Sequence, residues 1–207
     1  MAFLHLSLLK QKHPWTKEEW NTLVNTKITC WHERKLRAAA LNNSKMTYLN
    51  VQLHGLSGKP HPILQNISNT QDVKKLRLHL KFLTSDYLTN DRIALDQKGR
   101  SAACSLCGAQ DTIEHVLTLC SATNSVRNRL LPDLMNTVAV VQPTCELLNN
   151  YSSSAVMTQF ILDCTSFNLP DPFRIPNHNP RISEIFRISR DWCFGISSER
   201  TRLLKLL

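Results

Sequence analysis

Apolar residues recur at helical spacing along much of this chain, and the first such run begins after residue 16. Thr16 and Glu19 have the spacing of a capping box, in which each side chain accepts a hydrogen bond from the other residue's backbone N–H. The apolar positions that follow share one face of a helix and are Trp20, Leu23, Val24, Ile28 and Trp31. We therefore predict a long helix that ends at the Asn-Asn-Ser triplet of residues 42–44.

Residues 56–100 predict a loop followed by two further helices. Prolines at two positions, with glycines close by, disfavour regular structure over residues 56–62. Ser68 and Gln71 are placed to cap a helix, and its apolar seam would comprise Val73, Leu76, Leu80 and Leu83. The alternation of Leu76, Leu78, Leu80 and Phe82 also fits a strand, so both interpretations stay open here. A shorter helix is expected at about residues 86–96.

The last third of the chain predicts three more helical segments. Residues 124–131 have a helical pattern that should end at Pro132, because proline has no N–H to continue the hydrogen bonding. One or two helices are expected over residues 144–163, followed by a proline-containing loop over 164–179. Pro180 suits the first position of a final helix. The apolar stripe of that helix comprises Ile182, Ile185, Phe186, Trp192, Cys193, Ile196, Leu203 and Leu204.

The composition agrees with a mostly α fold, since five glycines in 207 residues are few for a turn-rich β-sandwich or barrel. We predict a helical domain with a small embedded Cys-Cys-His-Cys zinc-binding module. The expected divisions are a basic helical region at 1–99, the zinc-binding segment with its following helix at 100–135, and a C-terminal helical region at 136–207. No apolar run approaches the length of a membrane span, so no membrane partner is expected.

The most specific motif consists of Cys104, Cys107, His115 and Cys120. Gly108 directly follows the first cysteine pair, where a tight turn often requires a positive φ. A short helix should begin after Thr112 and end near Leu119, so that Cys120 can turn back toward the other ligands. Three thiolates and one imidazole are the ligands of a closed tetrahedral site, so we predict one structural Zn²⁺. The alternative is that the four residues are packing material, since free cysteine is commonly buried.

The three remaining cysteines are scattered, and the odd total of seven shows no disulfide framework. A chain of this kind is typical of a reducing compartment, so we expect it to be intracellular, in the cytoplasm or nucleus.

Positive charge is concentrated before the cysteine cluster. The net charge is +9, and residues 1–103 carry 16 basic and 7 acidic side chains, whereas residues 104–150 have a net charge of −2. RNA or DNA would therefore be attracted mainly by the segments that flank the metal ligands. The candidate contacts closest in sequence are Arg92, Lys98, Arg100, Arg127 and Arg129. The plainer interpretation of these residues is a solvated charged surface.

The residues that flank the cluster make the motif more specific. Residues 104–108 are Cys-Ser-Leu-Cys-Gly, residues 112–117 are Thr-Ile-Glu-His-Val-Leu, and Cys120 and Arg127 follow. This segment resembles the zinc-binding segment downstream of the reverse transcriptase in LINE-type (non-LTR) retrotransposon proteins. The likeness extends upstream to residues 45–49 and 58–62 and, less specifically, downstream to 160–163 and 189–193.

The resemblance implies the C-terminal part of a retrotransposon polyprotein, or a decayed or domesticated copy of one. It also implies a segment that binds nucleic acid beside the polymerase and helps to position template RNA or target DNA. The four metal ligands carry over from the family residue by residue, whereas the choice of basic residues that contact phosphate does not.

Enzymatic activity is not expected of this chain. It contains no adjacent pair of aspartates of the kind that reverse transcription uses, and four protein ligands leave a metal no open position for water. Pro132, Asp133 and Glu146 partly match a nuclease pattern, but no activating lysine follows them. The main alternative to nucleic-acid binding is a zinc-stabilised interaction module whose apolar helix stripes dock onto a polymerase domain.

Overall fold

The computed structural model describes residues 16–41, 46–49, 61–64, 67–141, 153–167 and 180–207. Within these ranges the chain is mostly helical and has no strand, only an isolated bridge between Ala103 and Gln110, which confirms the predicted fold class. None of the described helices combines the length and apolar character needed to cross a membrane. The α-helices are α1 (Lys17–Leu41), α3 (Thr70–Leu83), α4 (Asn90–Asp96), α5 (Asn124–Val141), α7 (Ser154–Leu162) and α8 (Pro180–Leu204).

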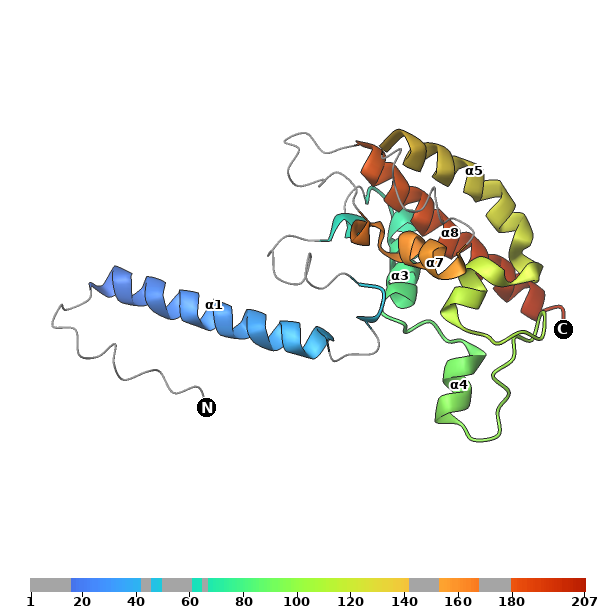
Figure 1. Cartoon of the computed structure of the whole chain (residues 1–207), viewed down its shortest axis with the longest axis horizontal. Coiled ribbons are helices and arrows are strands. Elements are labelled where there is room, and N and C mark those ends of the chain that lie inside the picture. Colours follow the sequence, from blue (N-terminus) through green and yellow to red (C-terminus); the bar gives the residue numbers. More distant parts are fainter. Residues whose placement is uncertain (1–15, 42–45, 50–60, 65–66, 142–152, 168–179) are drawn as a thin grey trace.

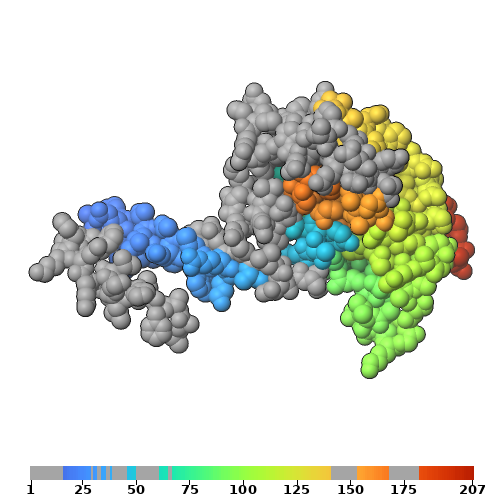
Figure 2. All heavy atoms as spheres, in the orientation of Figure 1, coloured from blue at the N-terminus to red at the C-terminus, as the bar shows by residue number. Residues whose placement is uncertain are grey.

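Helix α1 begins at the predicted capping box. The backbone N–H of Thr16 donates to Glu19 Oε2 over 2.8 Å, and the N–H of Glu19 donates to Thr16 Oγ1 over 3.2 Å. The helix ends at Leu41, and the triplet at 42–44 lies outside the described residues. Figures 1 and 2 show α1 beside the other helices rather than among them. Its large apolar side chains are consequently about half exposed, and they are Trp20, Ile28 and Trp31.

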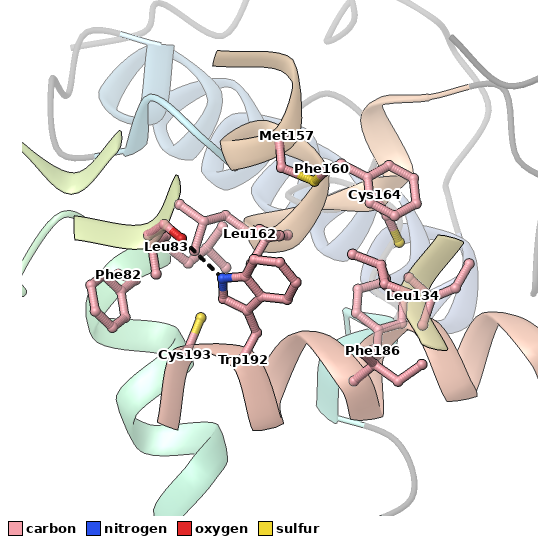
Figure 3. Packing of buried hydrophobic residues seen from close by; sticks show 14 of the residues in the cluster. Phe82, Leu83, Leu134, Met157, Phe160, Leu162, Cys164, Phe186, Trp192 and Cys193 are labelled. Carbon is pink, nitrogen blue, oxygen red and sulfur yellow. Dashed lines mark hydrogen bonds between the residues drawn. The ribbon is translucent and has the colours of Figure 1, made fainter. Parts of the chain in front are cut away.

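Helix α8 is the axis of the remaining structure, with α5 and α3 packed along it. Figure 1 shows α5 lying along α8 over much of its length. Pro180 is the first residue of α8, as predicted, and the apolar stripe is buried as far as Ile196, whereas Leu204 is 40% exposed. At the centre, Trp192 is buried, and its indole N–H donates to the carbonyl oxygen of Leu117 over 3.0 Å (Figure 3).

One hydrophobic core draws on all three regions expected from the sequence. It joins Phe82 from the first region, Leu117 from the second and Phe186 from the third. Helix α5 also runs without interruption across the division expected at residue 135. The divisions at 99/100 and 135/136 are therefore not boundaries between separate cores.

The prediction that a helix ends at Pro132 is wrong, because α5 continues through this residue to Val141. A proline inside a helix removes one hydrogen bond and costs about 3 kcal/mol. Beyond it, Leu134 and Val138 are both fully buried against the core. Burial of side chains of this size contributes about 1.5–3 kcal/mol each, which offsets the cost of the proline.

Helix α3 resolves the ambiguity between helix and strand, although its cap differs from the prediction. Asn69, not Ser68, is the N-cap residue, and its Oδ1 accepts from the N–H of Asp72 over 2.9 Å. Leu76 and Leu83 of the predicted seam are buried, whereas Val73 is 52% exposed.

Helix α4 is shorter than expected, and the helix predicted over 144–163 is described only in its second part. The helix expected at 86–96 begins only at Asn90. Helix α7 covers nine residues of the predicted 144–163 segment, of which 144–152 lie outside the described residues. The loop expected over 164–179 starts with a 3-10 turn at Cys164–Ser166, and residues 168–179 lie outside the described part.

His79 is a titratable group enclosed by this core. Its side chain is fully buried on α3, and Nε2 bonds the carbonyl oxygen of Leu162 over 2.9 Å, which joins α3 to α7. Burial lowers the pKa of His79 to about 4, and the positive charge of Arg190 nearby acts in the same direction. The imidazole is therefore neutral at pH 7 and donates its Nε2–H to the carbonyl.

We predict that His79 makes the fold sensitive to mild acid. Its pKa in the folded chain is about 4, below the ordinary value of 6.5, so the unfolded chain binds more protons between these values. Stability is therefore lost as the pH falls from 6.5 toward 4, by about 2 kcal/mol at pH 5. The measurement is urea unfolding at pH 7.5 and pH 5 with the metal site saturated. His79→Gln keeps a donor for Leu162 and should show a smaller pH dependence; an unchanged difference between the two pH values would contradict this role.

Candidate metal centre

The first cysteine pair lies in a tight turn that closes on itself. The N–H of Cys104 donates to the carbonyl oxygen of Ala109 over 2.6 Å, and the N–H of Gly108 donates to that of Cys104 over 2.8 Å. Gly108 has φ +81°, the positive value expected from the sequence. The backbone N–H of Asp111 donates to the carbonyl oxygen of Ala102 over 2.9 Å, which closes the base of the turn. These bonds direct the two sulfurs of the turn toward the helix that follows.

That helix begins as predicted and ends in a way that the sequence did not indicate. Thr112 Oγ1 accepts from the N–H of His115 over 3.0 Å, as an N-cap residue does. The segment His115–Leu119 is a π-helix, and the N–H of Cys120 donates to the carbonyl oxygen of His115 over 2.8 Å. The segment ends at Leu119, as predicted, although the expected reason was that five residues of regular α-helix rotate a side chain by about 140°. A π turn instead joins residues five apart directly, which places Cys120 above His115.

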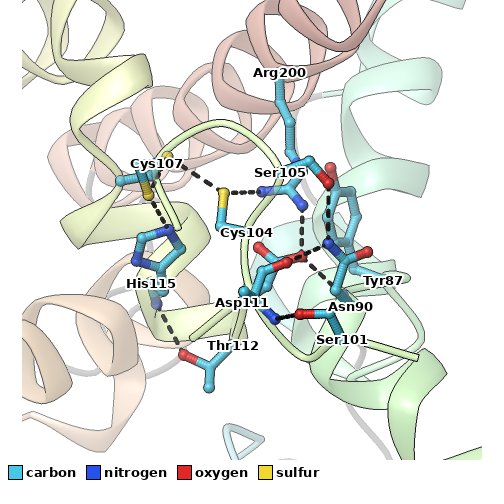
Figure 4. A network of polar contacts seen from close by, with 12 residues as sticks. Tyr87, Asn90, Ser101, Cys104, Ser105, Cys107, Asp111, Thr112, His115 and Arg200 are labelled. Carbon is cyan, nitrogen blue, oxygen red and sulfur yellow. Dashed lines mark hydrogen bonds and ion pairs between the residues drawn. The ribbon is translucent and has the colours of Figure 1, made fainter. Parts of the chain in front are cut away.

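The four predicted ligands come together. The Sγ atom of Cys120 lies 3.9 Å from that of Cys104 and 3.9 Å from that of Cys107, and Cys107 Sγ lies 3.2 Å from His115 Nε2. All four ligand atoms lie within 4.8 Å of one another. The sulfur separations far exceed a disulfide bond of about 2.05 Å. Cys104, His115 and Cys120 are buried and Cys107 is exposed, so the group can hold one metal ion near the surface (Figure 4).

The electrostatics of the cluster favour a bound cation. Burial lowers the pKa of His115, so its imidazole is neutral at pH 7 and has a lone pair for a metal. Burial, followed by the neighbouring sulfurs of Cys104 and Cys107, raises the pKa of the Cys120 thiol to about 11. The Cys120 thiol therefore resists ionisation on its own, whereas the burial of Cys107 is outweighed by hydrogen bonds from the backbone of Ala109 and from the neighbouring sulfurs, which lower the pKa of its thiol. A coordinated cation deprotonates the thiols that bind it.

A buried ion pair supports the turn from α8. The guanidinium of Arg200 donates to Asp111 Oδ2 over 2.6 Å and to Cys104 Sγ over 3.6 Å, and the side chains of Arg200 and Asp111 are 7% and 0% exposed. Asn90 donates to the same carboxylate through its backbone N–H over 2.7 Å and to the carbonyl oxygen of Ala103 through its side chain over 2.7 Å. The start of α4, the metal turn and the end of α8 therefore meet at Asp111 (Figure 4).

Arg127 supports the cluster from the opposite end. Its guanidinium is buried and donates to the carbonyl oxygen of Cys120, to Thr123 Oγ1 over 2.9 Å and to the side chain of Asn124. This guanidinium is therefore engaged in holding the loop after Cys120, and we remove Arg127 from the candidate nucleic-acid contacts. With a divalent cation bound, three thiolates would leave a net charge of −1, which Arg127 and Arg200 would offset from two sides.

The other basic candidates lie in different settings. The guanidinium of Arg92 donates to the carbonyl oxygen of Ser85, which engages one of its donors within the fold. Lys98 and Arg100 are exposed on the loop between α4 and the metal turn. Arg129 is exposed on α5, in a groove beside α8. Two of the five candidates, Lys98 and Arg100, therefore have exposed side chains on the loop that leads into the metal turn at residues 104–108.

Sequence reasoning missed the residues that support the ligands. Nothing in the local sequence around Asp111 or Asn90 indicates this role. Arg200 contacts Cys104 across 96 positions of sequence, and no local pattern marks such a contact. The sequence offered one signal, a basic residue, Arg200, at a position that belongs to the apolar stripe of α8.

No protein-family model matches this chain, and searches of curated proteins and of solved structures found no significant match. The site geometry therefore defines the class on its own, as a helical protein with a cluster of three cysteines and one histidine that can bind a metal ion.

We predict that Arg200→Met destabilises the folded chain by about 3–5 kcal/mol, because it leaves the carboxylate of Asp111 buried without its cation. Urea unfolding of the metal-loaded protein measures this. The matched control is Arg202→Met on the same helix, whose ion pair with Glu199 is exposed and should change stability by less than about 1 kcal/mol. Equal effects of the two substitutions would show that the buried pair has no special role.

Proposed function

We propose that the chain is a non-catalytic module that binds one structural Zn²⁺ and binds nucleic acid through basic side chains around the metal turn. The observation that carries the metal assignment is the spacing of the ligand atoms. In a tetrahedral site with Zn–S bonds of about 2.3 Å, neighbouring sulfurs are about 3.8 Å apart. The separations of 3.9 Å agree with this value, whereas the 3.2 Å between Cys107 and His115 would lengthen slightly on binding.

The ligand types support zinc over harder cations. Thiolate and imidazole suit Zn²⁺, whereas Mg²⁺ and Ca²⁺ prefer oxygen ligands. Four protein ligands complete a tetrahedral shell and leave no position for a reactive water. The zinc therefore supplies a structural cross-link between the turn at Cys104 and the π turn at Cys120. The residues around it position these ligands and have no part in hydrolysis.

We predict one zinc per chain by elemental analysis, and its loss in Cys107→Ser and His115→Ala. Structural zinc contributes on the order of 10 kcal/mol to the free energy of folding, so a chelator should strongly lower the melting temperature of the wild type. Because Arg200 and Trp192 connect this region to α8, the loss of helical structure should extend beyond residues 100–131. Cys30→Ser is the control, since Cys30 is exposed on α1. A melting curve unaffected by chelation would contradict the assignment.

Nucleic-acid binding rests on charge and on the resemblance of the metal segment to that of LINE-type retrotransposon proteins. The chain has a net charge of +9, with its basic excess before the ligands. Lys98 and Arg100 are exposed on the loop that leads into the metal turn, where the metal cross-link would hold them in place. Lysine and arginine contacts to phosphate position a nucleic acid without reading its sequence. The module would accordingly hold template RNA or target DNA beside a polymerase.

We predict that the zinc-loaded chain binds single-stranded oligonucleotides with an affinity that falls steeply with salt. Three phosphate contacts would weaken binding roughly 20-fold between about 50 and 200 mM salt. Fluorescence anisotropy with labelled RNA and DNA oligonucleotides measures this. Replacing both Lys98 and Arg100 by glutamine should reduce the slope of log affinity against log salt by about 1.4 while zinc content stays at one.

A second candidate function is docking onto a polymerase domain of the same polyprotein. The exposed apolar residues of α1 favour it, since Trp20, Ile28 and Trp31 form one face that no described helix covers. A chain that self-associates in sizing chromatography and binds no oligonucleotide would support docking over nucleic-acid binding.

A further inference from the structure

A groove separate from the metal ligands lies where three helices meet. Helices α3, α5 and α8 surround a space of about 670 Å³, within the range of roughly 300–1,000 Å³ that is typical of ligand sites. Its lining combines three cations, the carboxylates of Asp191 and Glu199, hydroxyl and amide groups and an aromatic ring. The residues that matter for its chemistry are Lys75, Ser125, Arg129, Phe194, Ser198 and Arg202.

The floor of the groove depends on a glycine. A Cβ atom at Gly195 would lie 2.9 Å from Cγ1 of Val126, closer than two carbon atoms can pack. The absence of a side chain therefore lets α5 approach α8 at this point. The same Cβ position lies 3.8 Å from Nη2 of Arg129, so the guanidinium lies close to the glycine.

The cations of the groove differ in how they are neutralised. Lys75 is paired with Asp191 over 2.6 Å, and Arg202 is paired with Glu199 over 2.7 Å. Arg129 is exposed, and no carboxylate within the described ranges forms an ion pair with it. An anion entering the groove would therefore meet one guanidinium that no described carboxylate pairs, together with two cations that are already paired with carboxylates of the lining.

The apolar part of the lining fits a flat ligand. Phe194 is half-buried on α8, beside Val126 and Leu130 of α5. Aromatic side chains in such positions stack on nucleic-acid bases regardless of sequence, and adjacent arginines bind the phosphates. Ser125 and Ser198 add hydroxyl groups that can bond a phosphate or a base edge.

We propose that this groove binds a short single-stranded segment of nucleic acid, with a phosphate on Arg129 and a base on Phe194. This inference rests on the proposed nucleic-acid binding and names a second contact region for it, apart from Lys98 and Arg100. An acidic peptide would also be attracted by Arg129, but it would make no use of an aromatic face beside hydroxyl groups.

The test compares two groove variants in the zinc-loaded full chain. The probe is a fluorescein-labelled oligo-dT of about 12 nucleotides, within the site sizes of single-strand binders. Arg129→Gln should weaken binding about fivefold and reduce the salt slope by about 0.7, because one phosphate contact is lost. Phe194→Leu should weaken binding by about fivefold or more without changing the salt slope, because stacking is not electrostatic.

The control is Arg34→Gln, an equal change of charge at an exposed position of α1. Melting curves and zinc content establish that each variant is folded. If the wild type binds and Arg129→Gln behaves like Arg34→Gln, the groove assignment is wrong while the proposed function stands. If the wild type binds no oligonucleotide, the proposed function itself fails. Displacement of the probe by polyglutamate at equal charge concentration would also overturn the assignment to nucleic acid.

Discussion

The buried ion pair between Arg200 and Asp111 is the contact on which the rest of this structure depends. Its two partners come from the end of the last helix and from the base of the metal turn, and both are removed from water. A charge in such a place is tolerated only when its partners satisfy it. Asp111 also accepts the backbone N–H of Asn90, so a single carboxylate sets where α4, the metal turn and α8 meet.

This arrangement makes the metal segment part of the helical core instead of an appended module. Trp192 reaches the backbone of Leu117 from α8, and Arg127 holds the carbonyl oxygen of Cys120 from α5. Both donors are buried, so the hydrogen bond to the backbone takes the place of one to water. A metal bound at the cluster would consequently be coupled to the packing of the helices, since both would act on the same few residues of backbone.

The same coupling separates the basic residues into two kinds. Arg127 and Arg200 are buried beside the cysteine cluster and bond to groups of the chain, whereas Lys98, Arg100 and Arg129 are exposed. The sequence does not distinguish these arginines and lysines, because the residue type does not indicate whether a side chain will bond a carbonyl group or stay in water. Arg127 illustrates this, since its position close to the ligands suggested a phosphate contact and its actual partners are in the chain.

Local patterns in the sequence determined the four ligands, the capping box at Thr16, the positive φ of Gly108 and the first residue of α8, because each depends on neighbours a few positions away. Only the tertiary structure decided that α5 passes through Pro132, since burial of Leu134 and Val138 against distant helices outweighs a local penalty. It also decided the π turn at His115–Leu119 and the pairing of Arg200 with Asp111. The ion pair joins residues 89 positions apart, for which spacing along the sequence carries no information.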